Sequence, residues 1–213
     1  MTQYLYLHGF ASSPQSMKAQ LLLRHFQTLG LPLAVPDLNQ GDFAHLTLSR
    51  QIQQVKDLIL PAQPTVLIGS SFGGLTAAWL AEQPELQGQI ERLVLMAPAF
   101  RFLEQWLPRL GEDQRQRWQS EGTLPVYHYS QQCQLPLHYR FITDAQTYDE
   151  QQLHQPIPTL ILHGQQDEVI SIQASRDYAA QRPWVKLIEL ESDHALGNVQ
   201  TEIWQAIRQF LEL

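Results

Sequence analysis

The sequence predicts an α/β protein with a mostly parallel sheet and helices on both of its faces. Three observations lead to this class: strand-like and helix-like segments alternate, the strand-like segments are continuous apolar runs, and one run enters a helix through a glycine-rich turn. Strands buried on both faces appear as unbroken apolar runs because helices cover both sides of the sheet. The expected strands are residues 4–7, 33–36, 65–68, 92–96, 159–163 and 185–190.

Helices are expected between these strands, because apolar residues recur there at the spacing of one helix face. The first should begin with Ser13 as N-cap and Pro14 at the first helical position, and should end at Gly30. The other expected helices are residues 48–60, 75–81, 172–180 and 198–211.

The regular alternation stops from Phe100 to about Pro158, where the chain is rich in aromatic residues and glutamine. A loop of that length without secondary structure is unusual in a compact domain. We therefore expect an inserted helical lid over about residues 100–158. Most of its aromatic side chains should pack on the core, and Phe102 and Trp106 are the candidates for lining a substrate pocket.

Length and composition predict a single soluble domain over residues 1–213. The chain has 213 residues, of which 44% are hydrophobic and 16% charged, so it can bury a substantial core. Its formal net charge of -7 argues against nucleic acid as a partner. Cys133 is the single cysteine, which excludes an internal disulfide and favours a reducing compartment, so we expect a cytoplasmic location.

The sequence gives no sign of a targeting or membrane segment. Only four consecutive apolar residues precede His8, which is too short for a signal-peptide core. No run of about 18 apolar residues occurs, so no membrane span is expected. The oligomeric state is left open.

A G-x-S-x-G motif, Gly69 to Gly73 with Ser71 at its centre, joins the apolar run 65–68 to the helical segment 75–81. At a strand-to-helix junction this motif is typical of a nucleophile elbow. Its glycines permit the sharp turn that holds the serine exposed at the end of the sheet. The motif therefore makes Ser71 the candidate nucleophile.

An acid and a histidine follow in the order of the α/β-hydrolases, with Asp167 after strand 159–163 and His194 after strand 185–190. A serine hydroxyl needs an adjacent base, and the base needs an acid that orients it. His194 and Asp167 are the candidates for these roles. The backbone N–H groups of Phe72 and Phe10, next to the serine and at the end of the first strand, are the expected oxyanion donors.

Several neighbouring residues are alternatives or have another expected role. Glu168 could be the acid in place of its neighbour, whereas the side chain of Asp193 should diverge from that of His194. His163 ends a core strand, but the chain order favours His194 as the base, so His163 is interpreted as a structural histidine. His8 should shape the oxyanion loop. The remaining histidines lack the spacing of a ligand set, so neither a metal nor another cofactor is predicted.

Two segments of the sequence resemble the YqiA-type esterases of the α/β-hydrolase superfamily. They are Leu-His-Gly-Phe-Ala-Ser-Ser-Pro at residues 7–14 and Gly-Ser-Ser-Phe-Gly-Gly at residues 69–74. The resemblance implies an eight-stranded hydrolase core that lacks its first strands. It also implies hydrolysis of carboxylic esters, with a preference for acyl-CoA or short acyl esters. By motif position it places the nucleophile, acid and base at Ser71, Asp167 and His194.

The expected function is that of a serine hydrolase acting on a small carboxylic ester, or a thioester, through an acyl-enzyme intermediate. The alternative is the same fold without hydrolysis, as a lyase-type enzyme or a ligand-binding receptor, because one fold hosts several functions. A polyanionic acyl-CoA would need local cations, and only scattered ones such as Lys18, Arg24, Arg101 and Arg109 are present. A simple ester is therefore the preferred small-molecule partner, and the natural substrate is left open.

Overall fold

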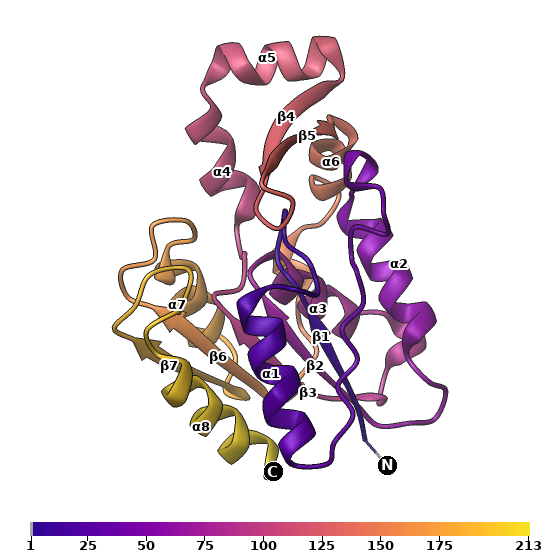
Figure 1. Cartoon of the computed structure of the whole chain (residues 1–213), viewed down its shortest axis with the longest axis vertical. Helices are drawn as coiled ribbons and strands as arrows, with labels where there is room; N and C mark the ends of the chain where they lie inside the picture. The colour runs from indigo at the N-terminus through magenta and orange to yellow at the C-terminus, as the bar shows by residue number, and fades with distance from the viewer. Residues whose placement is uncertain (1) are drawn as a thin grey trace.

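A computed structural model describes residues 2–213 of the chain. Its central sheet consists of β1 (Gln3–Leu7), β2 (Thr65–Ser70), β3 (Ile90–Met96), β6 (Thr159–Gly164) and β7 (Val185–Leu190). All neighbouring strands are parallel, in the order β1-β2-β3-β6-β7 (Figure 1). Every residue of β2 and β6 is buried, because these strands are covered on both faces. The predicted fold class is confirmed.

Helices cover both faces of the sheet because successive strand side chains point in opposite directions. Leu67 belongs to the hydrophobic cluster under α2 (Leu48–Leu58), α3 (Phe72–Ala81) and α7 (Ile172–Ala180). Ile68, the next residue, belongs to the cluster under α1 (Met17–Thr28) and α8 (Gln200–Leu211). Short 3₁₀ turns complete the connections at Phe43–His45 and Pro84–Leu86. No helix within residues 2–213 has the length and apolar character needed to cross a bilayer.

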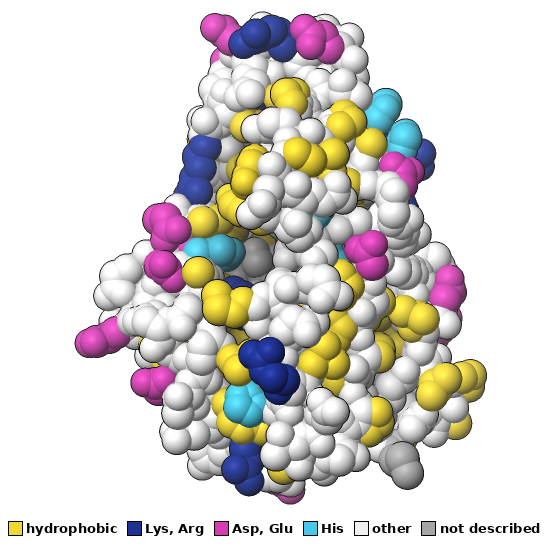
Figure 2. All heavy atoms as spheres, viewed as in Figure 1, with side chains coloured by type: hydrophobic (Ala, Val, Ile, Leu, Met, Phe, Trp, Pro, Cys, Tyr) yellow, Lys and Arg dark blue, Asp and Glu magenta, His cyan; other side chains and the backbone are white. Residues whose placement is uncertain are grey.

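The insertion between β3 and β6 rises over one end of the sheet (Figure 1). It contains α4 (Phe102–Leu110), α5 (Glu112–Glu121), β4 (Thr123–His128), β5 (Cys133–His138), α6 (Arg140–Ala145) and a 3₁₀ turn at Glu150–Gln152. Phe102, Trp118 and Phe141 of this insertion share one hydrophobic cluster with the face of the sheet under α3. In the space-filling view, hydrophobic side chains gather on the insertion and along its junction with the body of the molecule (Figure 2).

The insertion is a mixture of helices and a β-hairpin, whereas the sequence predicted a helical lid. Strands β4 and β5 pair in antiparallel register, with Leu124 opposite Leu137 and Pro125 opposite Pro136. The two leucines are buried and the two prolines are exposed. Proline is tolerated here because each strand of a two-stranded sheet has one unpaired edge. The prolines obscure the alternating pattern in the sequence, which is why the hairpin was missed.

The strand expected at residues 33–36 is reduced to a single parallel bridge. The amide of Tyr6 donates to the Ala34 carbonyl at 2.8 Å, and the amide of Ala34 donates to the Tyr4 carbonyl at 2.9 Å. Pro36 has no N–H and cannot extend this ladder. The segment therefore pairs with the edge of β1 without forming a strand.

The first helix begins later than the sequence predicted. Ser16 is its N-cap, with a side-chain oxygen that accepts the Ala19 amide at 3.4 Å, and α1 starts at Met17. Ser13 and Pro14 lie in the preceding loop, where the Ser13 hydroxyl caps a short turn. Two serines three residues apart offer competing caps, and packing on the sheet selects the second.

Candidate active site

Ser71 lies in a strained turn between β2 and α3. Its backbone has φ 53° and ψ -118°, a conformation that costs a non-glycine residue roughly 1–3 kcal/mol. Its amide donates to the Met96 carbonyl at 2.9 Å, and its carbonyl accepts the amides of Gly74 at 2.9 Å and Ala99 at 3.0 Å. These bonds tie the turn to β3 and the segment that follows it, and they hold Ser71 in this conformation.

The glycines of the motif are required by close backbone contacts. A Cβ atom on Gly69 would stand 2.4 Å from the carbonyl oxygen of Gly73, and one on Gly73 would stand 2.2 Å from that of Leu7. No side chain fits at either distance. The start of α3 can therefore press against the ends of β1 and β2 only with glycine at these positions.

Ser71, His194 and Asp167 form one chain of contacts. Ser71 Oγ is 3.1 Å from His194 Nε2, and His194 Nδ1 is 2.7 Å from Asp167 Oδ2. The three residues follow β2, β7 and β6, whose carboxyl ends lie at the same edge of the parallel sheet. With Asp167 ionised, Nδ1 carries the ring proton and Nε2 is free to accept the serine proton.

The carboxylate of Asp167 is fully buried and surrounded by donors. Its Oδ1 atom accepts the amides of Val169 and Ile170, each at 2.8 Å, and its Oδ2 atom lies 3.0 Å from His163 Nε2. Burial by itself raises the pKa of this carboxyl, but the hydrogen bonds from His163, His194 and the Ile170 amide outweigh it and hold the pKa below its ordinary value. Asp167 is therefore an anion at neutral pH.

The alternative acids make no contact with the histidine ring. Glu168 is exposed and has no hydrogen bond or ion pair with any other residue in the described part of the chain. Asp193 is exposed, and its carboxylate accepts the Leu196 amide at 3.2 Å. Asp167 is thus the carboxylate that the fold places beside His194.

The backbone loop after β1 lies directly against Ser71. A Cβ atom on Gly9 would be 3.3 Å from the Ser71 Cβ atom. His8 Nδ1 donates to the Gly9 carbonyl at 2.9 Å, and His8 Nε2 accepts the Leu38 amide at 3.0 Å. Burial lowers the pKa of His8, so the ring is neutral and holds this loop through both nitrogens.

Two backbone N–H groups next to the candidate nucleophile remain unused. Within residues 2–213, the amides of Phe10 and Phe72 donate to no other group. Phe72 is the first residue of α3, and the first N–H groups of a helix have no partner inside the helix. These amides are the ones that the sequence predicted as oxyanion donors.

The chain matches a family model over residues 3–212, nearly its whole length. That family is described as Uncharacterised protein family (UPF0227). The chain belongs to UPF0227. The match, together with the fold, confirms the resemblance to the YqiA-like branch of the α/β-hydrolase superfamily. A search of curated proteins gave no significant match.

Solved structures of α/β-hydrolases are similar to this UPF0227 chain. Est1E from Butyrivibrio proteoclasticus with bound ferulic acid has a TM-score of 0.82 at 20% identity, covering 100% of this chain and 88% of its own. Mouse alpha/beta hydrolase domain-containing protein 10 has a TM-score of 0.77 at 21% identity, covering 99% and 88%. A Paleococcus ferrophilus monoacylglycerol lipase has a TM-score of 0.76 at 16% identity, covering 98% and 93%. At these identities the similarity shows the fold.

The two lid residues predicted to touch substrate lie against Phe10, in the loop after β1 of this UPF0227 chain. The Phe10 ring is 6.1 Å from that of Phe102 and 5.6 Å from that of Trp106, measured between centroids. It also contacts Phe72 and Phe141 at 6.2 and 5.2 Å. Phe102 is buried and Trp106 is half-buried. The cluster forms an apolar wall from the insertion to the residue that follows Ser71.

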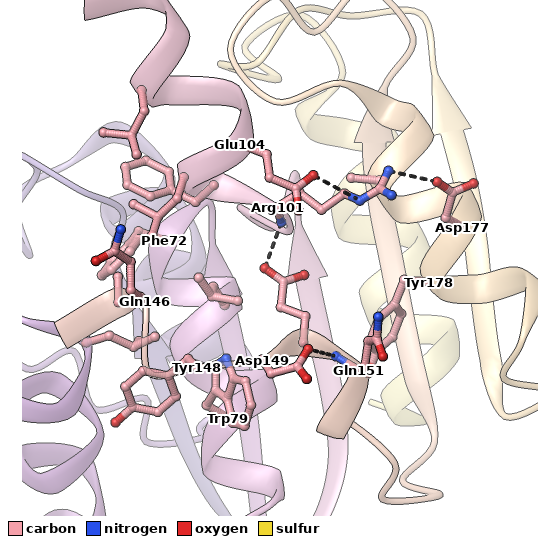
Figure 3. A pocket seen from close by; sticks show the side chains of 18 of the residues that line it. Phe72, Trp79, Arg101, Glu104, Gln146, Tyr148, Asp149, Gln151, Asp177 and Tyr178 are labelled. Carbon is pink, nitrogen blue, oxygen red and sulfur yellow. Dashed lines mark hydrogen bonds and ion pairs between the residues drawn. The ribbon is translucent and has the colours of Figure 1, made fainter. Parts of the chain in front are cut away.

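A cavity of about 550 Å³ opens between α3, α4, the segment after α6, and α7 (Figure 3). Phe72 and Phe102 line it, whereas Trp106, Ser71 and His194 do not. Figure 3 shows the ion-paired Arg101 and Asp177 on the side of the cavity opposite Phe72. The cavity therefore adjoins the aromatic cluster without reaching the Ser71 hydroxyl directly.

Glu150 is a half-buried acid in this cavity that no motif of the sequence marks. Its Oε1 atom accepts the Arg101 amide at 2.7 Å (Figure 3). Burial raises the pKa of Glu150 to about 7. No local motif marks this residue, because its burial arises only when the insertion folds back onto α7.

Lys18 also has a role that the sequence did not reveal, since it appeared there only as one of several scattered cations. Its Nζ atom donates to the His194 carbonyl at 3.5 Å. Burial lowers the pKa of Lys18 to about 8, against the opposing effect of Asp167 and Asp193. Helix α1 thus places the Lys18 ammonium group next to the backbone of the loop that carries His194.

Two of the histidines predicted not to bind metal, His45 and His138, lie together away from Ser71. His45 pairs with Asp42 at 2.9 Å and stacks on His138 at the surface. Within residues 2–213, no group of three or more His, Cys, Asp or Glu side chains is arranged to hold a metal ion. The absence of a cofactor stays a prediction.

Proposed function

We propose that this chain is a serine hydrolase that cleaves a small carboxylic ester through an acyl-enzyme intermediate. One observation carries the proposal: the contacts from Ser71 Oγ to His194 Nε2 at 3.1 Å and from His194 Nδ1 to Asp167 Oδ2 at 2.7 Å. A serine hydroxyl is a weak nucleophile alone, and this arrangement supplies the base and the acid that activate it.

In the first half-reaction, Ser71 Oγ attacks the ester carbonyl carbon while its proton moves to His194 Nε2. Asp167 stabilises the resulting imidazolium through Nδ1–H. The tetrahedral intermediate then collapses: the ester C–O bond breaks, and the leaving alkoxide takes the proton from Nε2 and departs as an alcohol. The acyl group remains on Ser71 Oγ.

In the second half-reaction, His194 deprotonates a water molecule, which attacks the acyl carbon. The bond from that carbon to Ser71 Oγ then breaks, Ser71 Oγ takes back the proton from His194 Nε2, and a carboxylic acid is released. Both tetrahedral intermediates carry a negative oxygen. The unused amides of Phe10 and Phe72 are suited to bind it, and each such donor contributes about 3 kcal/mol in serine hydrolases.

The surroundings favour a neutral ester with an apolar part. Phe10, Phe72, Phe102 and Trp106 form an apolar wall beside Ser71, while the chain carries a net charge of -7. Several proteins of similar structure are described in terms that agree with this choice. Est1E was solved with ferulic acid bound, and the others include a monoacylglycerol lipase and a pyrethroid hydrolase from Sphingobium faniae. A simple carboxylic ester is therefore proposed ahead of a CoA thioester.

A fluorophosphonate probe and a panel of p-nitrophenyl esters test the proposal. We expect the probe to label the wild-type chain on Ser71 and the esters to be hydrolysed with a burst of nitrophenol. Ser71→Ala should lose both, and Ser70→Ala, one residue away, should keep them. If the probe labels Ser71→Ala at the wild-type rate, Ser71 is not the nucleophile. A folded wild type that neither reacts nor hydrolyses supports the alternative, a lyase-type enzyme or a ligand-binding receptor.

A further inference from the structure

We propose that His163 is a positioning residue of this site. It orients the Asp167 carboxylate, and both His163 and His194 interact with the negative charge of that carboxylate. The role of the site as a hydrolase centre rests on the function proposed above. The coupling between the two histidines through Asp167 is a separate statement, and it can be measured without turnover. It assigns a specific task to a histidine that the sequence suggested was only structural.

The His163 ring is completely buried at the end of β6. Its Nε2 atom lies 3.0 Å from Asp167 Oδ2 and 3.0 Å from the Ile170 carbonyl oxygen. A lone pair at Nε2 would face two oxygens, so Nε2 carries a proton. Nδ1 is 2.8 Å from Ser175 Oγ, and in the neutral ring it accepts the hydroxyl proton.

The contacts extend the candidate triad by two residues. Ser175 on α7 orients His163, and His163 shares Asp167 Oδ2 with His194, whose Nδ1 atom is 2.7 Å from the same oxygen. The chain of contacts therefore runs from α7 through both histidines to Ser71. Because two amides occupy the other carboxylate oxygen, the orientation of Asp167 is determined on every side.

The charge on Oδ2 sets how strongly Asp167 stabilises a protonated His194. A donor at His163 Nε2 draws part of that charge away from the His194 ring. Removing the donor leaves more negative charge facing His194, so its imidazolium becomes more stable. The midpoint of the His194 titration should then move to higher pH.

Other charged groups lie around this pair of histidines. Lys18 approaches the His194 carbonyl from α1, and Asp193 precedes His194 in the same loop. On the side of β7, Glu189 forms an ion pair with Arg176 at 2.7 Å. None of these groups hydrogen-bonds to the His163 ring, and Glu189 interacts with it only electrostatically. The direct change at Asp167 in a His163 variant is therefore the loss of the Nε2 donor.

The test follows the His194 ring by NMR in protein with isotope-labelled histidine, for His163→Leu, His163→Gln and Ser175→Ala. His163→Leu removes the donor, and we expect the His194 midpoint to rise by about one pH unit. His163→Gln keeps an N–H donor and should restore part of the wild-type value. Ser175→Ala loosens the ring and should give a smaller rise. The pH dependence of fluorophosphonate labelling should move with the NMR midpoint.

Thr159→Val is the matched control. It removes a buried hydroxyl from the opposite end of β6, where Thr159 Oγ1 donates to the Ile157 carbonyl at 2.8 Å. We expect it to lower the melting temperature and leave the His194 midpoint unchanged. Unchanged midpoints in His163→Leu and Ser175→Ala overturn the proposal. If His163→Leu does not fold, unchanged midpoints in His163→Gln and Ser175→Ala overturn it equally. A shifted midpoint in a protein that no phosphonate labels supports the coupling and refutes only the hydrolase.

Discussion

The amide of Tyr129, at the tip of the β4–β5 hairpin, donates a hydrogen bond to the Ala11 carbonyl at 3.0 Å. Ala11 directly follows Phe10, whose amide is the proposed oxyanion donor. Ala11 also has a positive φ of 52°, which is strained for alanine. The insertion therefore helps to hold the loop after β1 in a conformation that the loop alone does not favour.

Asn39 bridges the loop after β1 and the insertion, which predicts the effect of Asn39→Ala. Asn39 Nδ2 donates to the Ser12 carbonyl at 2.7 Å and lies 3.4 Å from His128 Nε2. Without Asn39, the loop after β1 should hold the Phe10 amide less precisely. We therefore expect kcat to fall roughly tenfold with little change in KM. Steady-state kinetics with a p-nitrophenyl ester measure this. A fall in melting temperature with normal kcat would show that Asn39 only stabilises the fold.

Replacing the proposed acid should separate it from its neighbour. Asp167→Asn should lower kcat about 10³–10⁴-fold, as the equivalent change does in a chymotrypsin-type enzyme, because the amide cannot stabilise the imidazolium. Glu168→Gln changes an exposed side chain without partners and should have little effect. The two variants are compared in the same ester assay. A larger loss of kcat in Glu168→Gln than in Asp167→Asn would identify Glu168 as the acid.

Glu150 predicts a pH-dependent stability. Its pKa is raised to about 7 in the folded chain, above its value in the unfolded chain, so the folded state binds the extra proton. Stability from this group is complete below about pH 4 and decreases as the pH rises through 7. Glu150→Gln stays neutral and can still accept the Arg101 amide. Its melting temperature should match wild type at low pH and exceed it at pH 8, and equal values at both pH values would contradict the assignment.

The aromatic wall predicts a role for the insertion in substrate choice. Phe102→Ala or Trp106→Ala should change the ratio of kcat/KM between short and medium acyl esters several-fold, since apolar pockets discriminate at about 1–3 kcal/mol per methylene. Phosphonate labelling of Ser71 should persist. Phe26→Leu is the control, because Phe26 is fully buried on the opposite face of the sheet, in the cluster under α1 and α8. It should lower the melting temperature without altering the ratio, and an unchanged ratio in the first two variants would make their role structural.

Much of the core could be predicted because its signals are local. A buried parallel strand requires a continuous apolar run, and the turn after β2 requires glycine at positions 69 and 73. The order of Ser71, Asp167 and His194 along strand ends was visible for the same reason. The bridge at Ala34 and the N-cap at Ser16 were not, since each depends on which neighbour the segment packs against.

Residues adjacent in the chain encode the parallel sheet, the sharp turn at Ser71 and the loops that carry Asp167 and His194, so these features could be predicted from the sequence. Folding is what brings His163 into contact with Asp167 and places Lys18 next to the His194 carbonyl. Folding also joins the hairpin to the loop after β1. These contacts join groups from separate loops, helices and strands. Their distances and burial depend on packing in three dimensions, which no local pattern of side chains records.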